Sequence, residues 1–132
     1  MAQQTLKTLQ KAVDVLAFGA HPDDVELSAG GTLAKLASQG KRCAIVDLTR
    51  GELGTRGSAE LRDREAAASA SILGLVHREN LGLADGFFEV NEDSLCLVVS
   101  AIRRLRPSVV LANALEDRHP DHGRGAELVA RA

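Results

Sequence analysis

Apolar residues along the chain follow two alternating patterns, continuous short runs and recurrence at helical spacing. Four short runs are almost continuously apolar, which is typical of strands buried on both faces of a parallel sheet. The predicted strands are 13–19, 43–48, a weaker run at 79–83, and 108–113. Between them apolar residues recur at helical spacing. The predicted helices are one ending at Gly40, one between Ser58 and Gly74, one over 95–105, and one beginning near His122.

This alternation predicts an α/β fold, a Rossmann-like three-layer sandwich in which helices cover both faces of a mainly parallel sheet. A chain of 132 residues is enough for one core and not for two, so a single domain over 1–132 is expected. The alanine-rich stretch 66–73 predicts a helix that packs closely on the sheet. If the first and fourth strands are neighbours, the loops that follow them meet at the carboxyl edge of the sheet.

Composition and charge exclude several kinds of partner. Aromatic residues make up only 2% and the net charge is −2, so the chain has neither a ladder of rings for bases nor a basic stripe, and we expect no nucleic-acid partner. No apolar run is long enough to span a bilayer and no export signal begins the chain, so a cytoplasmic protein without a membrane partner is expected. Cys43 and Cys96 lie in apolar surroundings and are expected to be buried thiols.

Two short clusters of histidine and aspartate follow the first and fourth predicted strands. They read His-Pro-Asp-Asp from His21 to Asp24 and His-Pro-Asp-His from His119 to His122. Imidazole and carboxylate are the ligands that zinc takes when thiolates are not used. A catalytic zinc needs about three protein ligands and an open position for water. His21 and Asp24, on either side of a helix start, can supply two ligands and His122 the third.

The other cluster residues suit catalytic roles around such an ion. Asp23 would lie beside the metal without binding it and could take a proton from water. His119, one helical turn before His122, could stabilise an oxyanion. Asp121 could orient one of the imidazoles.

A structural role competes with this interpretation, because helix ends favour aspartate and proline for reasons of dipole and backbone. That role explains either cluster alone about as well as metal binding does. It does not explain why three of the four histidines follow strands. The fourth, His77, has no such context and is expected at the surface. A nucleotide-binding domain is disfavoured, because the turn after Gly19 lacks the glycine spacing that phosphates need.

The segment 49–58 contains three glycines and no apolar period, which predicts a sizeable loop of the kind that carries function. Its Glu52 and Arg56 are candidates for substrate contact. For Arg56 and Arg62 a salt-bridged role is about as plausible as a substrate contact.

Together these residues resemble a known family, the LmbE-like or PIG-L-like zinc-dependent N-acetylglucosamine deacetylases. The matching segments are 20–24, 49–57, Arg62 with Glu65, 80–86 and 116–122. The segments 80–86 and 116–122 look most like the bacillithiol-biosynthesis branch, whose members remove the acetyl group from N-acetylglucosaminyl malate.

The resemblance implies a zinc ion, or another divalent metal such as Fe²⁺. Its implied ligands are His21, Asp24 and His122. It further implies Asp23 as general base and later acid, and His119 as electrophilic partner supported by Asp121. By the same resemblance, residues of three segments would line the sugar pocket: Glu52, Arg62 and Asp85. Arg56 is our candidate for the malate carboxylates, argued from its charge and its place in the loop.

Members of the resembled family continue well beyond the last helix of this chain. The sequence is therefore expected to represent the N-terminal portion of the family fold and to lack its C-terminal portion. Exposed apolar edges are expected where more chain would pack, and they favour association into a homo-oligomer. The alternative to a deacetylase is a non-catalytic carbohydrate-binding or regulatory module of the same fold.

Overall fold

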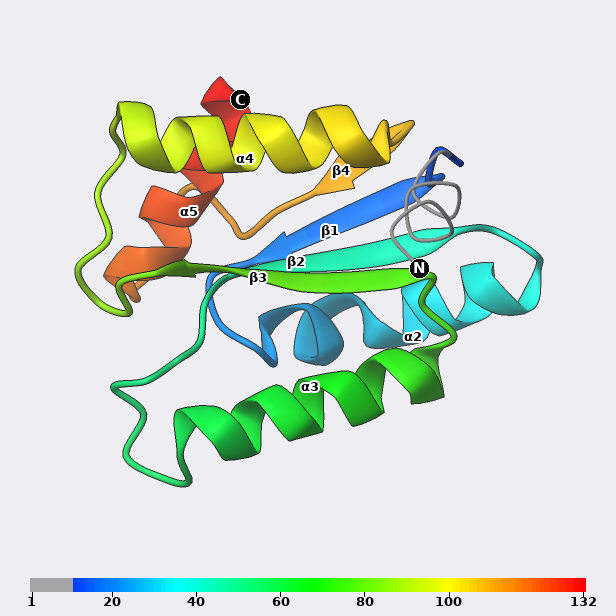
Figure 1. The fold of residues 1–132 in the computed structure, drawn as a ribbon, viewed down its shortest axis with the longest axis horizontal. Coiled ribbons are helices and arrows are strands. Elements are labelled where there is room, and N and C mark those ends of the chain that lie inside the picture. The colour runs from blue at the N-terminus through cyan, green and yellow to red at the C-terminus, as the bar shows by residue number, and fades with distance from the viewer. Residues whose placement is uncertain (1–10) are drawn as a thin grey trace, which may run out of the picture.

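The computed structural model describes residues 11–132 and confirms the expected α/β fold (Figure 1). The strands are β1 Val15–Gly19, β2 Cys43–Thr49, β3 His77–Leu83 and β4 Val109–Leu111. The helices are α2 Asp24–Ser38, α3 Ala59–Leu73, α4 Glu92–Leu105 and α5 Pro120–Arg131. Within residues 11–132, no helix has the length and apolar character needed to cross a membrane.

The four strands form one parallel sheet in the order β3-β2-β1-β4. β1 pairs with β2 from Val15 opposite Cys43 and with β4 from Val15 opposite Val109. The first and fourth predicted strands are therefore neighbours. The direction of winding changes at β1, which is where open α/β sheets place their sites.

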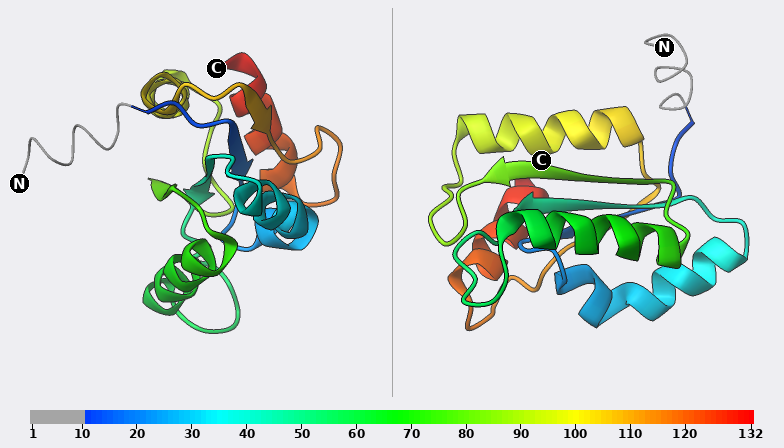
Figure 2. Two further views of the ribbon diagram at one scale, coloured as in Figure 1. Left: turned by 90° about the vertical axis from the view of Figure 1, so that its right-hand side faces the viewer. Right: turned by 60° about the horizontal axis from the view of Figure 1, so that its bottom comes forward.

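Helices cover both faces of the sheet, with α4 and α5 on one side and α2 and α3 on the other (Figures 1 and 2). Successive residues of β1 point to opposite faces. Leu16 and Phe18 belong to the apolar cluster that includes Val98 of α4 and Leu128 of α5. Ala17 belongs to the second cluster, which contains residues of β2 and α2. The sheet is thus buried on both faces, as its continuous apolar strands predict.

The predicted ends of α3 are confirmed, whereas its predicted packing is wrong. The Ser58 side chain accepts a hydrogen bond from the Leu61 backbone N–H, and Gly74 takes the left-handed conformation at φ 71°. No residue of α3 is fully buried. The helix lies beside α2 at the β3 edge of the sheet (Figure 2), so its short alanine side chains do not reach a core.

Three further expectations need correction. β4 has only three residues, and Val109 and Val110 are 50% and 40% exposed, because this strand forms an edge of the sheet. Cys43 is buried as expected, but Cys96 is exposed on α4. His77 begins β3 and lies 3.4 Å from a Glu79 carboxylate oxygen with its side chain 26% exposed, so it is half-buried and not a free surface residue.

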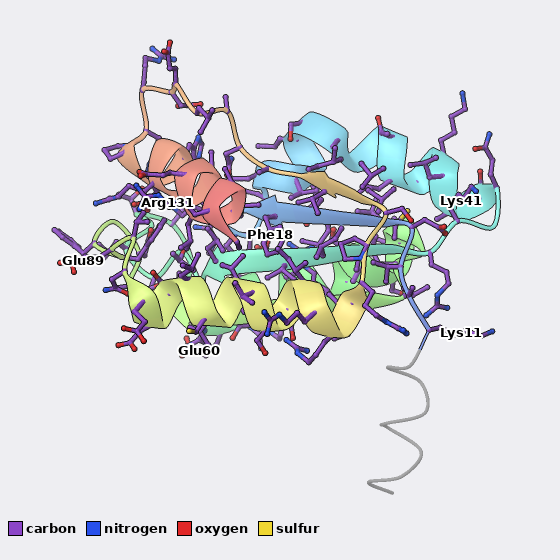
Figure 3. The ribbon with its side chains drawn as sticks, turned by 90° about the horizontal axis from the view of Figure 1, so that it is seen from above. Lys11, Phe18, Lys41, Glu60, Glu89 and Arg131 are labelled. Carbon is purple, nitrogen blue, oxygen red and sulfur yellow. The ribbon has the colours of Figure 1, made fainter. Side chains whose placement is uncertain are left out.

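All four strands point toward one end of the molecule. In Figure 3, Lys11 and Lys41 lie at the amino end of the strands and Glu89 lies at the opposite end, near the start of α5. The loops that follow the four strands gather at this carboxyl edge. The predicted site residues lie in these loops or in the first turn of the helix that follows, such as Asp24 of α2, Arg62 of α3 and His122 of α5.

Candidate metal centre

The first cluster lies in a tight turn between β1 and α2. The His21 backbone N–H donates to Asp24 Oδ2 at 3.1 Å, which closes the turn. A side chain at Gly19 would come within 3.1 Å of Val25 and 3.2 Å of Asp24, closer than ordinary contacts allow. Glycine at the end of β1 therefore lets the chain bring His21 and Asp24 to the same side of the sheet edge.

The second cluster forms the start of α5. Pro120 occupies the first turn, where its missing N–H costs nothing. His119 caps the helix, and its Nδ1 accepts a hydrogen bond from the Asp121 backbone N–H at 3.1 Å. An accepting Nδ1 carries no proton, so the proton of a neutral His119 ring is on Nε2. His119 is thereby prepared as a hydrogen-bond donor.

The structure brings the two clusters together. His21, Asp24 and His122 each offer one ligand atom, and these atoms lie within 4.8 Å of one another. Asp24 Oδ2 is 3.2 Å from His122 Nε2 and 3.6 Å from His21 Nδ1. The rings of His119 and His122 stack with centroids 4.8 Å apart.

The outer nitrogens of both candidate ligand rings face carboxylates. His21 Nε2 lies 2.9 Å from Asp121 Oδ2 and 3.1 Å from Asp85 Oδ1. His122 Nδ1 lies 3.3 Å from Asp117 Oδ2. Carboxylates that hold the outer N–H leave the inner nitrogen of each ring free to bind a metal. One oxygen and two nitrogens at this spacing fit the donor preferences of zinc and of Fe²⁺.

The charges of the cluster depend on one another. Burial disfavours a charged His21 ring, but its hydrogen bonds with Asp24 and Asp121 outweigh burial and raise its pKa to about 9. Burial likewise disfavours the Asp24 carboxylate, but the hydrogen bonds from His21 lower its pKa to about 2. The cluster thus holds a carboxylate that stays ionised at neutral pH and attracts a cation.

Asp23 differs from its neighbour in exposure and backbone. Its side chain is 53% exposed, and burial of the rest, together with the Asp24 charge, raises its pKa. Its φ of 150° lies where residues other than glycine are rarely found. Strain of this kind persists where the surrounding structure imposes it, and it is frequent at functional sites. Asp23 lines a cavity of about 480 Å³ together with Arg56, Arg62 and Glu65.

The residues expected to contact substrate lie in different surroundings. Arg62 donates to the carbonyl oxygens of Pro22 at 3.2 Å and Gly51 at 3.3 Å and pairs with Asp23, so it holds the loops in place. Arg56 is exposed on the cavity wall.

Glu52 and Asp85 join the loops to each other and to the candidate metal ligands. Glu52 Oε1 accepts from the Asp85 backbone N–H at 2.9 Å. Asp85 is 8% exposed, and its carboxylate lies beside the outer nitrogen of His21.

Sequence reasoning gave no role to Asn113, Asp117 or Arg124. Asn113 contacts Ala20 and Asp24, and Arg124 donates to Asp121 Oδ1 at 2.6 Å. A polar residue at the end of an apolar strand was the available signal for Asn113, and an acidic residue close to the histidines was the signal for Asp117.

A family model described as PIG-L, GlcNAc-PI de-N-acetylase, matches residues 16–132. The chain belongs to this family. The expected relation to PIG-L-like deacetylases is therefore confirmed, while the bacillithiol branch stays a prediction.

Individual PIG-L relatives cover nearly all of the chain. An uncharacterized deacetylase of Escherichia coli K12, YaiS, is 36% identical over 124 residues, which is 89% of this chain and 66% of that protein. The crystal structure of the conserved protein TT1542 of Thermus thermophilus is 45% identical, with a TM-score of 0.86, over 89% of this chain and 54% of that one. The structure of an N,N'-diacetylchitobiose deacetylase of Pyrococcus horikoshii in complex with an inhibitor is 27% identical, with a TM-score of 0.84. The match covers 98% of this chain and 54% of that one.

Membership of the PIG-L family does not by itself fix the reaction. A 4-oxalmesaconate hydratase of Pseudomonas putida is 31% identical over 144 residues, covering 99% of this chain and 55% of that protein. The chain spans between about half and two thirds of the length of these relatives.

Proposed function

We propose that the protein is a metal-dependent N-deacetylase that removes the acetyl group from an N-acetylglucosaminyl conjugate. The observation that carries the proposal is the convergence of His21, Asp24 and His122 beside Asp23, which opens on the 480 Å³ cavity. These three residues would hold zinc or another divalent ion. Such an ion would polarise the acetyl carbonyl and make water more acidic.

The residues around the proposed ligands have separate roles in proton transfer and in stabilising the oxyanion. Asp23 takes a proton from the attacking water and returns it to the amine that leaves as the amide C–N bond breaks, giving acetate. A raised pKa suits a carboxylate that must accept and release a proton near neutral pH. His119 donates its Nε2–H to the negative charge that develops on the carbonyl oxygen. Asp121 supports both histidines, through its backbone N–H for His119 and its carboxylate for His21.

N-acetylglucosaminyl malate is the proposed substrate. The family description and the diacetylchitobiose deacetylase relative support an acetylated glucosamine. The malate part rests on exposed, cationic Arg56 at the cavity wall, since guanidinium groups bind carboxylates in pairs of hydrogen bonds. Contacts of Glu52, Arg62 and Asp85 with the sugar are part of the same proposal.

The hydratase relative favours one second candidate, the addition of water to an unsaturated carboxylic acid. The same base and the same ion would serve, because both reactions begin by activating water near a polarised carbonyl. Hydration breaks no C–N bond and releases no amine, so the products separate the two candidates.

The test is amine release from N-acetylglucosaminyl malate by the protein after addition of Zn²⁺ or Fe²⁺. We expect Asp23→Asn to lower kcat by roughly 10²–10⁴-fold, since a general base is lost, while metal affinity is retained. Asp63→Asn is the matched control. Asp63 lies on α3 and pairs with Arg50, away from His21, Asp24 and His122. Full activity in Asp23→Asn would contradict its role as the base. Sugar binding without amine release by the metal-loaded wild type would instead support a carbohydrate-binding module, and product without amine from an unsaturated acid would support a hydratase.

A further inference from the structure

The segment between β4 and α5 makes polar contacts with both halves of the metal cluster. Its Asn113 and Asp117 contact groups on α2, on the turn before α2, and at the start of α5. We propose that Asn113 and Asp117 are positioning residues for the metal: Asn113 fixes the orientation of the Asp24 carboxylate, and Asp117 leaves Nε2 of His122 as the nitrogen that binds. The proposal rests on the metal binding proposed above and extends it to two residues outside the ligand set.

Asp117 fixes His122 by two separate contacts. Its Oδ2 lies 3.3 Å from His122 Nδ1, and its Oδ1 accepts from the His119 backbone N–H at 2.9 Å. The second contact holds the Asp117 carboxylate on the residue that caps α5, so the first contact acts from a fixed point. An Nδ1–H held by a carboxylate leaves the Nε2 lone pair of His122 for a ligand. That nitrogen is the one that faces Asp24, at 3.2 Å from Oδ2.

Asn113 acts in the same way on the first half of the cluster. Its Oδ1 accepts from the Ala20 backbone N–H at 3.0 Å, and its Nδ2 donates to Asp24 Oδ2 at 3.3 Å. The amide therefore joins the end of β4 to the turn after β1 and to the ligand carboxylate. Asp24 Oδ2 also accepts from the His21 backbone N–H, so two donors fix the orientation of this carboxylate before any ion arrives.

These contacts fix the relative position of the two loops, which strand pairing alone does not. Pairing of β1 with β4 brings the two clusters near each other, but the last paired residues are Ala17 and Leu111. Beyond them the loops have no ladder hydrogen bonds to set their relative position. Asn113 connects the two loops through its hydrogen bonds with Ala20 and Asp24. Asp117 in the same way fixes His119 and His122 relative to the loop after β4. Preorganised ligands bind a metal more tightly because less is ordered on binding.

The test measures metal affinity directly, by competition of the protein with a chromogenic chelator for Zn²⁺. We expect Asp117→Ala to weaken binding by roughly 10- to 100-fold and Asn113→Ala by about 10-fold, as for other partners of metal ligands. Asp117→Asn should be intermediate, because the amide keeps one acceptor and loses the charge. Glu116→Gln is the matched control: it removes the same charge from the adjacent residue, which is exposed and makes no contact with His122.

Nitrogen NMR of His122 provides a readout that a purely structural role would not change. In its neutral form the wild-type ring should carry the proton on Nδ1, and Asp117→Ala should shift population to the other tautomer. Wild-type affinity in folded Asp117→Ala would overturn the proposal, and so would an equal loss in Glu116→Gln or a proton on Nε2 of wild-type His122. Failure of the wild type to bind any divalent metal would instead overturn the proposed function.

Discussion

Two ionic networks meet at the first turn of α2, and they differ in the cation on which each is built. In one, Asp24 contacts the imidazoles of His21 and His122. In the other, Glu26 pairs with the Arg78 guanidinium, which also donates to both Asp47 oxygens at 2.8 and 3.1 Å. An arginine is always charged and holds its partners in a fixed fork, whereas a histidine can exchange its proton for a metal.

Burial sharpens the difference between the networks. Asp47 is only 2% exposed and the Arg78 side chain 7%, and burial raises the pKa of Asp47 to about 6 although Arg78 works against it. The Asp24 side chain is somewhat less buried, at 10% exposed, and the hydrogen bonds from His21 lower its pKa to about 2 although burial works against them. The arginine network stabilises β2, β3, α2 and α3 against one another. The histidine network keeps an ionised carboxylate facing two rings that can become ligands.

The largest expected effect comes from removing the permanent cation. Arg78→Met leaves the buried Asp47 and the half-buried Glu26 without their guanidinium partner, and we expect the free energy of unfolding to fall by about 3–5 kcal/mol. Urea unfolding of the metal-free protein measures it. Metal affinity of the folded protein should change little, because the hydrogen-bond partners of Arg78 lie outside the metal cluster.

Arg103→Met is the control for this change. Arg103 is exposed on α4, and removing its charge should alter stability by no more than about 0.5 kcal/mol. A loss of metal affinity in Arg78→Met as large as its loss of stability would show that the two networks act as one.

A smaller effect is expected from displacing the histidine network without changing a charge. A side chain at Gly125 of α5 would come within 2.9 Å of Leu48 Cδ1, and Leu48 is 1% exposed, so it has little room to move. Gly125→Ala should cost about 1–3 kcal/mol by overpacking. Because α5 carries His122, its shift should also weaken metal binding, unlike the change at Arg78.

Gly31→Ala in α2 is the matched control, because nothing lies within 4 Å of the added methyl group. It should leave metal affinity unchanged and raise stability by up to about 1 kcal/mol, as alanine favours a helix. Metal affinity unaffected by Gly125→Ala would mean that α5 can shift without moving His122.

Most of the fold and the convergence of the two histidine clusters could be predicted from the sequence, because both follow from local patterns along the chain. Apolar runs identified the strands, and the two histidine clusters stand directly after β1 and β4. Edge effects were not predictable in this way. Val110 is exposed because β4 is an edge strand, and α3 is exposed because it lies beside the other edge strand, β3; no local pattern encodes either position.

Partners distant in sequence were missed for the same reason. Asn113 contacts Ala20 across 93 residues, and Arg78 contacts Asp47 across 31. Asn113 offered only its place at the end of an apolar strand as a signal, and nothing in residue type or spacing distinguishes Arg78 from arginines that face solvent.

The smallest expected effect concerns Glu79, which lies beside both a histidine and an arginine. Its carboxylate lies 3.4 Å from His77 Nε2 and 2.7 Å from Arg104, and the nearby His77 ring and then the hydrogen bonds from Arg104 lower its pKa from 4.5 to about 2. A lowered pKa gives stability that is present above pH 4.5 and is lost as the pH falls toward 2. Glu79→Gln should therefore cost about 1 kcal/mol at neutral pH, a modest value because Arg104 is 41% exposed, and should match the wild type near pH 2.

Unfolding by urea at several pH values between 2 and 7 measures the difference, with Glu89→Gln as the exposed control. An acid dependence of stability equal in wild type and Glu79→Gln would contradict the assignment. A second variant, Arg104→Met, separates the cations: if the guanidinium carries most of the effect, it should remove most of the acid dependence although His77 remains. That result would show that arginine stabilises the fold at the half-buried Glu79 pair as well as at the buried Asp47 pair. If the acid dependence instead persists in Arg104→Met, His77 carries it, and histidine in this protein also has a purely structural use.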